Sequence, residues 1–511
     1  MGHTVDVALL VGCALLLVSV LAVRLSARSG VPALLVYLLI GLVVGEDGLG
    51  FHFHDYRLTQ EIGLVALAVI LAEGGLTTRW QQLKPVAVPT LLLSTVGVVV
   101  GVAVVAGTCV LVLGSSPRTA LLLGATVSST DAAAVFSVLR RFALRARLRV
   151  LLEAESGFND APTTVLVAVA SSSHWGHDSG WLVVGLFVYE LSAGLVIGLA
   201  VGYAGRWSLG RLALPSAGLY PLATVALVLL AFAGAGAVGG SGFLAVYVAG
   251  IVVGSTRLPH RRAVLGFVTS LALLAELALF VLLGLLASPS RLLSAVPVAL
   301  LVGAVALFVA RPLAVLLTTG PFGYRWREQV FLSYAGLRGA VPIVLAIVPV
   351  ANHVPDGPKV LDAVFVLVAV YTLLQGPTLP WVGRRLGVVE ALEARDLEVE
   401  AAPLESVGAD LLQVTVRPGS HLHGVYVDEL RLPAGAVLSL VVRDGAGTVP
   451  TPNTILQRGD QLLVVATTAS RAAAEERLRA VSRDGKLARW YGGRPAGVRT
   501  ELVDRRRSPR P

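Results

Sequence analysis

Long apolar runs, separated by short polar stretches, follow one another along the chain until about residue 383. A helix that crosses a lipid bilayer needs about 20 mainly apolar residues. About thirteen runs of roughly that length are present, although the ninth is short. The pattern predicts an all-α polytopic membrane protein with spans at 5–23, 30–46, 61–77, 86–113, 118–138, 150–170, 181–205, 217–238, 243–256, 263–287, 293–318, 328–350 and 359–383.

The last quarter of the chain has a different pattern. Residues 386–405 are rich in Glu and Ala and predict a helical linker. In 406–485, short apolar stretches alternate with Pro-Gly, Asp-Gly and Gly-Asp turns, which predicts a small α+β domain. Residues 486–511 are expected to be disordered. The predicted domains are therefore a transmembrane domain at 1–385, a linker, and a tail domain with strands at 411–416, 436–443 and 461–465 and a helix at 470–482.

Composition narrows the class of protein. Hydrophobic residues make up 55% and charged residues 14% of the 511 residues, and the mean hydropathy is +0.78. Soluble globular domains carry about 25% charged residues, and a nucleic-acid-binding protein would share the net charge of +9 but not this hydrophobicity. The two cysteines, Cys13 and Cys109, lie in apolar runs without a CxxC motif, so we expect no disulfide framework and no metal or redox scaffold.

The basic residues indicate the orientation in the membrane. The net charge is 24 − 16 = +8 in 1–385 and 17 − 16 = +1 in 386–511. Loops that follow odd-numbered predicted helices contain 18 Lys and Arg, and loops that follow even-numbered helices contain 4. Since cytoplasmic loops are enriched in Lys and Arg, we expect a multi-pass plasma-membrane protein with its N-terminus outside and its tail domain in the cytoplasm. A cytoplasmic domain on a membrane protein of this kind is more often regulatory than passive, so we expect the tail to regulate activity.

Ionisable residues within spans are costly in a bilayer and are candidates for function. Asp131 ends the hydroxyl-rich stretch Thr126–Asp131, which can supply oxygen ligands to a hard cation and weakens the helix locally. Ser156 and Asp160 share a helix face, whereas Glu155 and Asp160 are about 140° apart and should have different partners. The whole set of intramembrane ionisable residues is Glu73, Asp131, Glu153, Glu155, Asp160, Glu190, Glu276, Arg311 and Arg338.

The span at 328–350 contains two glycines and a proline around a deep arginine. Arg338 lies between Gly336 and Gly339, and Pro342 follows. Helix-breaking residues at this density predict a broken helix, a usual feature of a transporter core.

The charges within the spans divide into two groups. We expect Glu155 and Arg338 to form a structural ion pair that braces two helices. Too few intramembrane cations remain to neutralise Asp131 and Asp160, so a bound ion or proton is favoured there. Glu153 and Glu190 are more typical of helix ends near the interface, and the role of Glu276 is open.

Three motifs together resemble the monovalent cation:proton antiporter family, more narrowly its electroneutral NhaP-type branch and the bacterial potassium/proton antiporters with a cytoplasmic tail. The tail around 416–465 resembles the TrkA-C (RCK C-terminal) ligand-binding domain. The membrane motifs are Thr130-Asp131, Glu155-Ser156-x-x-Asn159-Asp160 and Gly336-Leu337-Arg338-Gly339-Ala340-Val341-Pro342.

The resemblance implies a fold and an assembly. Thirteen helices would form two inverted six-helix repeats that flank the seventh helix, with broken crossing helices at the fifth and twelfth positions. Each subunit would have a core domain and a dimerisation domain and would form a homodimer in the lipid bilayer.

The resemblance also implies an activity. The protein would not be an enzyme but an antiporter that exchanges K⁺, favoured over Na⁺, for H⁺ without moving net charge, in pH and ion homeostasis. It would need no cofactor, while a nucleotide or cyclic dinucleotide is a candidate ligand of the tail. The monovalent cation would bind at Asp160 and Asp131, with Thr130 and Ser156 as further ligands and Asn159 and Glu73 nearby.

Other classes of function fit less well. A Na⁺/H⁺ antiporter of the same fold is the main alternative. A cation channel would need a polar pore or a carbonyl filter, and no TVGYG-like loop is present. An intramembrane protease would need a Ser/His or paired-Asp arrangement, and the hydroxyls beside Asp131 suit ion ligation better. An anionic-solute transporter stays a remote alternative because Arg311 is a second deep arginine.

Overall fold

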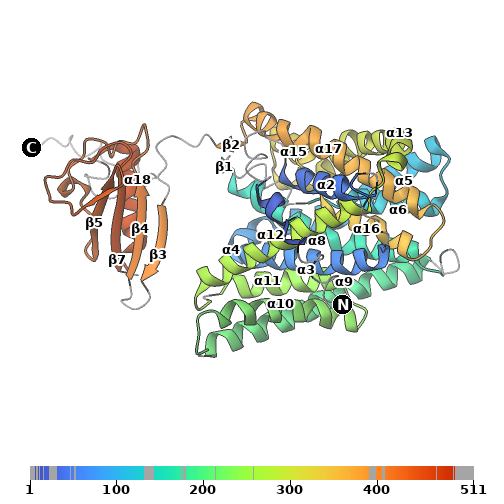
Figure 1. Ribbon diagram of the computed structural model, residues 1–511, viewed down its shortest axis with the longest axis horizontal. Coiled ribbons are helices and arrows are strands. Elements are labelled where there is room, and N and C mark those ends of the chain that lie inside the picture. The colour runs from blue at the N-terminus through green and yellow to red at the C-terminus, as the bar shows by residue number, and fades with distance from the viewer. Residues whose placement is uncertain are drawn as a thin grey trace, which may run out of the picture. The chain divides into compact units, whose positions relative to one another are not determined.

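The computed structural model divides the chain into two compact units, Met1–Glu390 and Ala391–Pro511 (Figure 1). The first is helical and the second is built around a β-sheet. The structure describes residues 6, 10, 12–14, 16–21, 32–46, 48–50, 53, 55–131, 143–173, 175, 180–212, 214–256, 258–390, 399–404, 409–467, 469–486 and 488.

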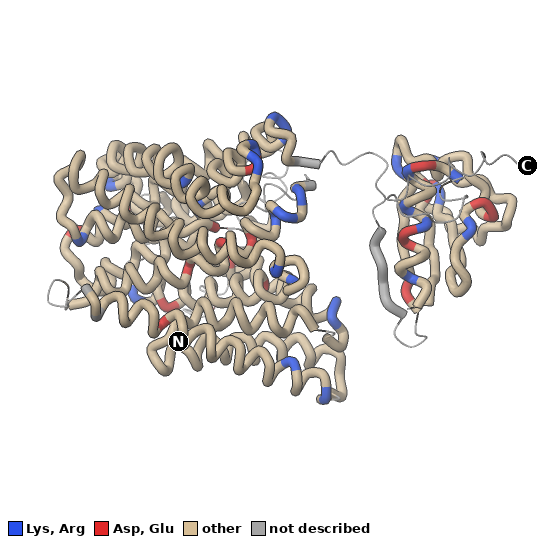
Figure 2. The backbone as a smooth tube through the Cα atoms, turned by 180° about the vertical axis from the view of Figure 1, so that it is seen from behind, with Lys and Arg blue, Asp and Glu red and all other residues tan. Residues whose placement is uncertain are grey.

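The helical unit is a multi-pass membrane bundle. Figure 2 shows Lys and Arg mostly at helix ends, whereas several Asp and Glu lie within the bundle. Its helices are α2 (Ala33–Val44), α3 (Tyr56–Thr77), α4 (Trp80–Leu83), α5 (Ala87–Leu113), α6 (Pro117–Ser128), α8 (Ala146–Ser171), α9 (Gly180–Arg211), α10 (Leu219–Ala237), α11 (Gly242–Gly254), α12 (Arg261–Leu286), α13 (Pro289–Val305), α14 (Arg311–Thr319), α15 (Trp326–Tyr334), α16 (Ala340–Ala351) and α17 (Gly357–Leu386).

Among the described residues, seven helical segments are long and apolar enough to cross a membrane. Others, such as α2, α11 and α16, are apolar but shorter. The polytopic helical class is thereby confirmed, while the count of thirteen spans and their inverted repeats stay predictions. The first predicted span, 5–23, is described only in part. The seven segments are Tyr56–Thr77, Trp80–Leu113, Val183–Arg211, Leu219–Ala237, Arg261–Leu286, Pro289–Phe322 and Gly357–Leu386.

Two of the predicted spans are interrupted near the middle of the bundle. The helix expected over 118–138 ends at Ser128, and Ser129 adopts an extended conformation, since hydroxyl side chains compete with helical backbone bonds. Residues 132–138 lie outside the described part. The helix expected over 328–350 is divided into α15 and α16, with Gly336–Gly339 outside regular structure.

The tail unit is an antiparallel sheet with the strand order β3-β4-β7-β5-β6. Buried and partly exposed residues alternate along β4 and β7, so that Leu412, Val414, Leu462 and Val464 lie in one core with Leu478 of the helix. Its elements are β3 (Val399–Leu404), β4 (Ala409–Thr415), β5 (Ala436–Arg443), β6 (Ala446–Thr448), β7 (Gln461–Thr467) and α18 (Arg471–Asp484).

The helical linker predicted at 386–405 is wrong over part of its length. Strand β3 lies inside that range and pairs with β4 along its whole length. Residues 391–398 and 405 of the predicted linker lie outside the described residues. The predicted disordered segment 486–511 lies outside the described residues, apart from Lys486 and Ala488.

A short two-stranded ribbon joins the end of the helical unit to the start of α8. Strand β1 (Ala143–Leu144) pairs antiparallel with β2 (Val389–Glu390). Arg145, which directly precedes α8, donates from its backbone N–H to Val388 O at 3.4 Å and from its side chain to Gly387 O at 3.2 Å. The chain that leads to the tail is thereby hydrogen-bonded to the base of the helix that carries Asp160.

Candidate functional site

The two interrupted spans meet at their breaks. The Asp131 N–H donates to Leu337 O at 2.8 Å, and the Ala340 N–H donates to Asp131 Oδ2 at 3.3 Å. Gly339 makes this approach sterically feasible, because a Cβ atom there would lie 1.7 Å from Asp131 Oδ2. Glycine is therefore required at position 339, because the Asp131 carboxylate occupies the space that a side chain there would fill.

Opposite charges lie at the helix ends that the two breaks create. The Asp131 carboxylate lies at the N-terminus of α16, where unpaired N–H groups favour an anion. The Arg338 guanidinium donates to Val127 O at 3.1 Å, near the C-terminus of α6, and to Gly336 O at 3.0 Å. Each break is thus neutralised by a side chain from the other, which explains how these interruptions are tolerated inside a membrane domain.

A cluster of oxygen atoms lies where α8 passes the first break. Asp160, 2% exposed, accepts a hydrogen bond from Ser129 Oγ at 2.7 Å. Ser156 Oγ donates to Thr130 O at 2.6 Å, and Asn159 Nδ2 donates to Thr130 Oγ1 at 2.7 Å. The Asn159 side-chain oxygen is buried and has no hydrogen-bond partner among the described residues.

The chemistry of this cluster suits a small hard cation. It combines the Asp160 carboxylate with hydroxyl, amide and backbone oxygens from the extended stretch after α6, and all these groups are buried. Oxygen is the ligand that hard cations prefer. A carboxylate in this setting can hold either a proton or a cation, since burial penalises the bare anion.

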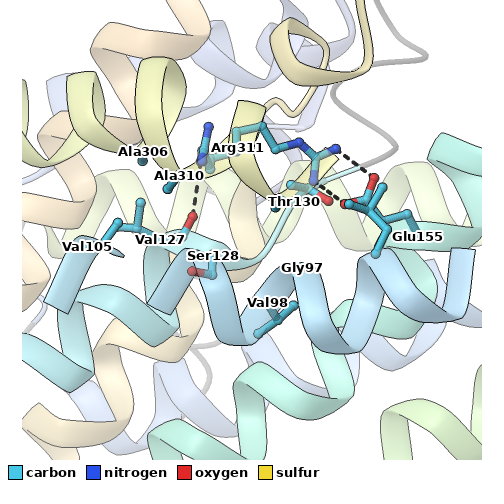
Figure 3. A pocket seen from close by; sticks show the side chains of 14 residues that line it. Gly97, Val98, Val105, Val127, Ser128, Thr130, Glu155, Ala306, Ala310 and Arg311 are labelled. Atoms are coloured by element: carbon cyan, nitrogen blue, oxygen red, sulfur yellow. Dashed lines mark hydrogen bonds and ion pairs between the residues drawn. The ribbon is translucent and has the colours of Figure 1, made fainter. Parts of the chain in front are cut away.

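The predicted ion pair of Glu155 with Arg338 is wrong. The partner of Glu155 is Arg311 (Figure 3). Both terminal nitrogens of the Arg311 guanidinium, Nη1 and Nη2, contact the Glu155 carboxylate, and the distance from Nη2 to Oε2 is 2.7 Å. Both side chains are buried, at 1% and 7% exposed. Arg338 instead donates to the carbonyls at the two breaks.

A π-helical turn, Ala306–Ala310, explains why Arg311 reaches Glu155. It lies between α13 and α14 and changes the register immediately before Arg311. Gly336 also contributes, because a Cβ atom there would lie 2.8 Å from Arg311 Nε. As the helical spacing predicts, Glu155 and Asp160 therefore have different partners.

A small cavity of about 20 Å³, enough for about one water molecule, lies beside this pair. Thr130 lines it and also contributes to the Asp160 cluster. The cavity therefore adjoins the oxygen cluster on the side of the ion pair. Its other lining residues include Gly97, Gly101, Glu155, Arg311 and Arg338.

The structure brings most of the predicted site residues together in one cluster: Thr130, Asp131, Ser156, Asn159 and Asp160. For Glu73, the contacts seen are with other groups. Its Oε1 accepts a hydrogen bond from Thr269 Oγ1 at 3.2 Å, and it is within electrostatic range of Glu153. A role of Glu73 at the cation site stays a prediction.

Sequence reasoning misses two residues of the site. Ser129 donates directly to Asp160, yet in the sequence it is one of several hydroxyls in the same stretch. The position of Arg311 in an apolar span is a signal of function, but nothing local indicates which carboxylate it faces.

Comparison with known proteins finds similarity over nearly the whole chain. Residues 14–385 match the sodium/hydrogen exchanger transmembrane family, and residues 411–479 match the TrkA-C domain. The chain is 36% identical to the K⁺/H⁺ antiporter NhaP of Alkalimonas amylolytica over 91% of this chain and 82% of that protein. It is 31% identical to the K⁺/H⁺ antiporter NhaP2 of Shewanella sp. strain MR-4, over 97% and 87% of the two chains.

More distant similarities concern a sodium antiporter and the fold. The Na⁺/H⁺ antiporter ApNhaP of Aphanothece halophytica is 29% identical over 75% of this chain and 76% of its own length. Among solved structures, the sodium proton antiporter MjNhaP1 of Methanocaldococcus jannaschii aligns with a TM-score of 0.62 and 23% identity. That alignment covers 73% of this chain and 96% of MjNhaP1. At this identity the likeness shows a shared fold.

Proposed function

The chain belongs to the sodium/hydrogen exchanger family, and on that premise we propose that it is a secondary antiporter exchanging a monovalent cation for a proton. The observation that carries the proposal is the buried Asp160 carboxylate, which shares its pocket with hydroxyl and carbonyl oxygens at the crossing of two broken helices. Asp160, Thr130, Ser156 and Asp131 supply or orient the ligands of the cation.

Exchange follows from competition for one carboxylate. A buried carboxylate is stable when it carries a proton or faces a cation, and costly when it does neither. Binding of the cation therefore requires release of the proton, and the reverse. If the site is open to one side of the membrane at a time, this competition becomes an obligatory exchange.

Asn159 supports one-for-one exchange. It occupies the position before Asp160, and its amide is a ligand and hydrogen-bond donor that does not titrate. Asn159 therefore adds no second titratable carboxylate beside Asp160. One proton leaves for each monovalent cation that enters, and the exchange is electroneutral.

The cation is K⁺ in this proposal, with Na⁺ as the alternative. The NhaP and NhaP2 relatives, which have the higher identities, are named K⁺/H⁺ antiporters, and the more distant ApNhaP is named a Na⁺/H⁺ antiporter. The match of residues 411–479 to the TrkA-C domain favours the same choice.

The finer architecture belongs to the same proposal. Thirteen spans in two inverted repeats would place the breaks after α6 and α15 in equivalent positions. The protein would be a homodimer in the plasma membrane, with its N-terminus outside and its tail in the cytoplasm. The basic residues at the ends of α9 and α17, including Arg206, Arg211, Arg384 and Arg385, support that orientation.

Regulation by the tail would act through the β1–β2 ribbon. Two residues separate the end of α17 from β2, and one residue, Arg145, separates β1 from α8. Arg145 links the ribbon to α15 through an ion pair with Glu328 at 3.1 Å. Ligand binding to the tail, for which a nucleotide or cyclic dinucleotide is the candidate, would therefore reach both α8 and the second broken span.

Proton movement in proteoliposomes tests the function. The full chain is reconstituted with an internal pH dye under an imposed pH gradient, and KCl, NaCl or choline chloride is added. We expect K⁺ to dissipate the gradient, Na⁺ to do so less, and choline to have no effect, with no dependence on membrane potential. A gradient that no monovalent cation dissipates would overturn the proposal, and a larger response to Na⁺ would select the alternative.

A further inference from the structure

Tyr247 of α11 has a buried hydroxyl without an assigned role. Its side chain is 1% exposed, and the hydroxyl faces Thr78 without forming a hydrogen bond of normal geometry. The Thr78 hydroxyl itself donates to Gly74 O at 2.7 Å. A buried hydroxyl without a partner costs about 1–3 kcal/mol, so an orphan of this kind in a transport domain needs an explanation.

The ring of Tyr247 lies against α8 between two carboxylates. A Cβ atom on Gly157 would lie 2.4 Å from Tyr247 Cζ and 2.5 Å from Cε2, so the hydroxyl end of the ring covers this glycine. Gly157 is four residues after Glu153 and three before Asp160, and residues at these spacings share a helix face. The charges of Glu153 and Asp160 both act on the Tyr247 hydroxyl.

A second glycine allows the ring to approach α3 as well. A Cβ atom on Gly74, next to Glu73, would lie 3.7 Å from Tyr247 Cε2. The edge-to-face contact with Phe158, with ring centroids 5.2 Å apart, holds the ring in this orientation. The phenol is therefore wedged between α3 and α8, at two positions that have no side chain.

Access to water differs on the two sides of this wedge. Glu153 and Glu73 are partly exposed, lie within electrostatic range of each other and are close to Arg149. Asp160, on the other side, is 2% exposed. Tyr247 thus lies between the partly exposed carboxylates of Glu73 on α3 and Glu153 near the start of α8, on one side, and the buried oxygen cluster on the other.

We propose that the Tyr247 hydroxyl is an intermediate ligand of the transported cation, on the path from Glu153 to the oxygen cluster at Asp160. A phenol oxygen can accept a cation while its O–H donates to a carboxylate, so it replaces water molecules as the ion loses its hydration shell. This role gives the orphan hydroxyl its partner in the loaded protein. The inference rests on the antiporter function proposed above and adds a specificity-determining residue to it.

Tyr247→Phe tests the role of the hydroxyl, because it keeps the ring and its contacts with Gly157 and Phe158. Exchange is measured in everted and right-side-out membrane vesicles, over a range of K⁺ concentrations. We expect the variant to melt at the same or a higher temperature, since an unpaired buried hydroxyl is removed. The KM for K⁺ should rise about tenfold, the equivalent of one lost hydrogen bond to a charged group. The rise should appear on the side of the membrane where α8 begins, and should be absent on the other side.

Tyr220→Phe is the matched control. Tyr220 is also a buried tyrosine, but its hydroxyl has partners at Leu212 O and Leu214 N, and it lies on α10. We expect a lower melting temperature and an unchanged KM. If the KM for K⁺ were unchanged in Tyr247→Phe while the unaltered protein exchanged normally in the same vesicles, the role of Tyr247 would be overturned and the proposed antiporter function would stand. Loss of exchange in the unaltered protein would instead overturn the proposed function.

Discussion

Asp160 in the helical unit and Asp460 in the tail unit are both buried carboxylates, 2% and 0% exposed, but their donors differ. Asp460 accepts hydrogen bonds from two nitrogens of Arg443, each at 2.8 Å, and from the Gln457 N–H at 2.7 Å. The described contacts of the Asp160 carboxylate comprise one hydrogen bond, from the Ser129 hydroxyl.

The difference separates a structural carboxylate from one that can exchange its ligand. Burial raises the pKa of Asp460, but the bonds from Arg443 and from the Gln457 N–H outweigh it and hold that pKa below its usual range. Asp460 is therefore ionised at neutral pH and held in place by fixed donors. Asp160 has a neutral hydroxyl as its donor and a second carboxylate, Asp131, within electrostatic range, so its charge is balanced by whatever it binds.

The largest effect should come from Asp160→Asn. The amide keeps a bond with Ser129 but holds neither an exchangeable proton nor a charge for the cation. We expect exchange in proteoliposomes to fall to the background of empty vesicles, with the melting temperature of the purified protein within a few degrees of that of the unaltered protein.

Asp356→Asn provides the control for that variant. Asp356 is partly exposed and has a positive φ of 62°, a conformation that Asn also tolerates. Exchange should be unchanged. If Asp160→Asn exchanged K⁺ for H⁺ normally, Asp160 would not be the carboxylate that carries exchange, and its contrast with Asp460 would be wrong.

Removing Arg311 should destabilise the helical unit more than removing Arg338. Arg311→Ala leaves the buried Glu155 carboxylate without its partner, which costs about 3–5 kcal/mol. Arg338→Ala leaves carbonyls unpaired instead and should cost about 1–3 kcal/mol. Thermal unfolding in detergent measures both.

Arg291→Ala is the control, because Arg291 is partly exposed and its contact with Asp362 is 4.0 Å long. A pair of this kind contributes at most about 1 kcal/mol. A greater loss from Arg338→Ala than from Arg311→Ala would contradict the assignment of Arg311 to Glu155.

Asp460→Asn should affect stability and not transport. The amide loses the charge-assisted bonds with Arg443, and we expect the tail unit to lose about 2 kcal/mol. Hydrogen exchange of β5 and β7 in the full chain should become faster, while K⁺/H⁺ exchange stays measurable. If K⁺/H⁺ exchange were abolished while hydrogen-exchange protection of the strands stayed the same, Asp460 would be a functional residue and its contrast with Asp160 would be wrong.

The stability of the tail unit should decrease in acid because of the same carboxylate. A carboxyl group whose pKa is lower in the folded state stabilises the fold at pH values above its unfolded pKa of about 3.9. That contribution is lost as the pH falls through the lower pKa of the folded state. Strand protection should therefore be constant from about pH 7 to 5 and fall below about pH 4, and Asp460→Asn should weaken this dependence. The same acid loss in the variant would show that other groups cause it.

The smallest effect should come from Ser129→Ala. One neutral hydrogen bond to Asp160 is lost, so we expect the KM for K⁺ to change by about threefold to tenfold, with the protein still folded. Ser129→Thr should restore most of the affinity because it keeps the hydroxyl. Equal KM values in all three proteins would show that Ser129 has no part in the site.

The local features were predictable because they have local causes. Apolar runs of sufficient length predict spans, and Thr126–Asp131 and Gly336–Pro342 predicted the two interruptions, since these residues weaken helices wherever they occur. The tail strands were predictable from alternation and turn residues. The edge strand β3 was missed, because its residues Val-Glu-Ala-Ala-Pro-Leu include helix formers and do not alternate, and only its pairing with β4 makes it a strand.

The partners within the site were not predictable in the same way. Glu155 and Arg311 are 156 positions apart, and their pairing depends on the π-helical turn before Arg311 and on the packing of both α14 and α8 against α5. From the sequence, Arg338 was an equally suitable partner for Glu155. Its actual contacts with Val127 O and Gly336 O arise because the breaks expose carbonyls that need a donor.

The sequence by itself determined the membrane class, the family and the two breaks, and it singled out Asp160 as the candidate for the exchangeable carboxylate. These features depend on composition, periodicity and short motifs. The tertiary structure alone decided which arginine neutralises Glu155, that Ser129 donates to Asp160, and that Tyr247 lies between Glu153 and Asp160. The physical reason is that charge pairing and hydrogen bonding act over about 3 Å, and only the packing of distant helices decides which side chains come that close.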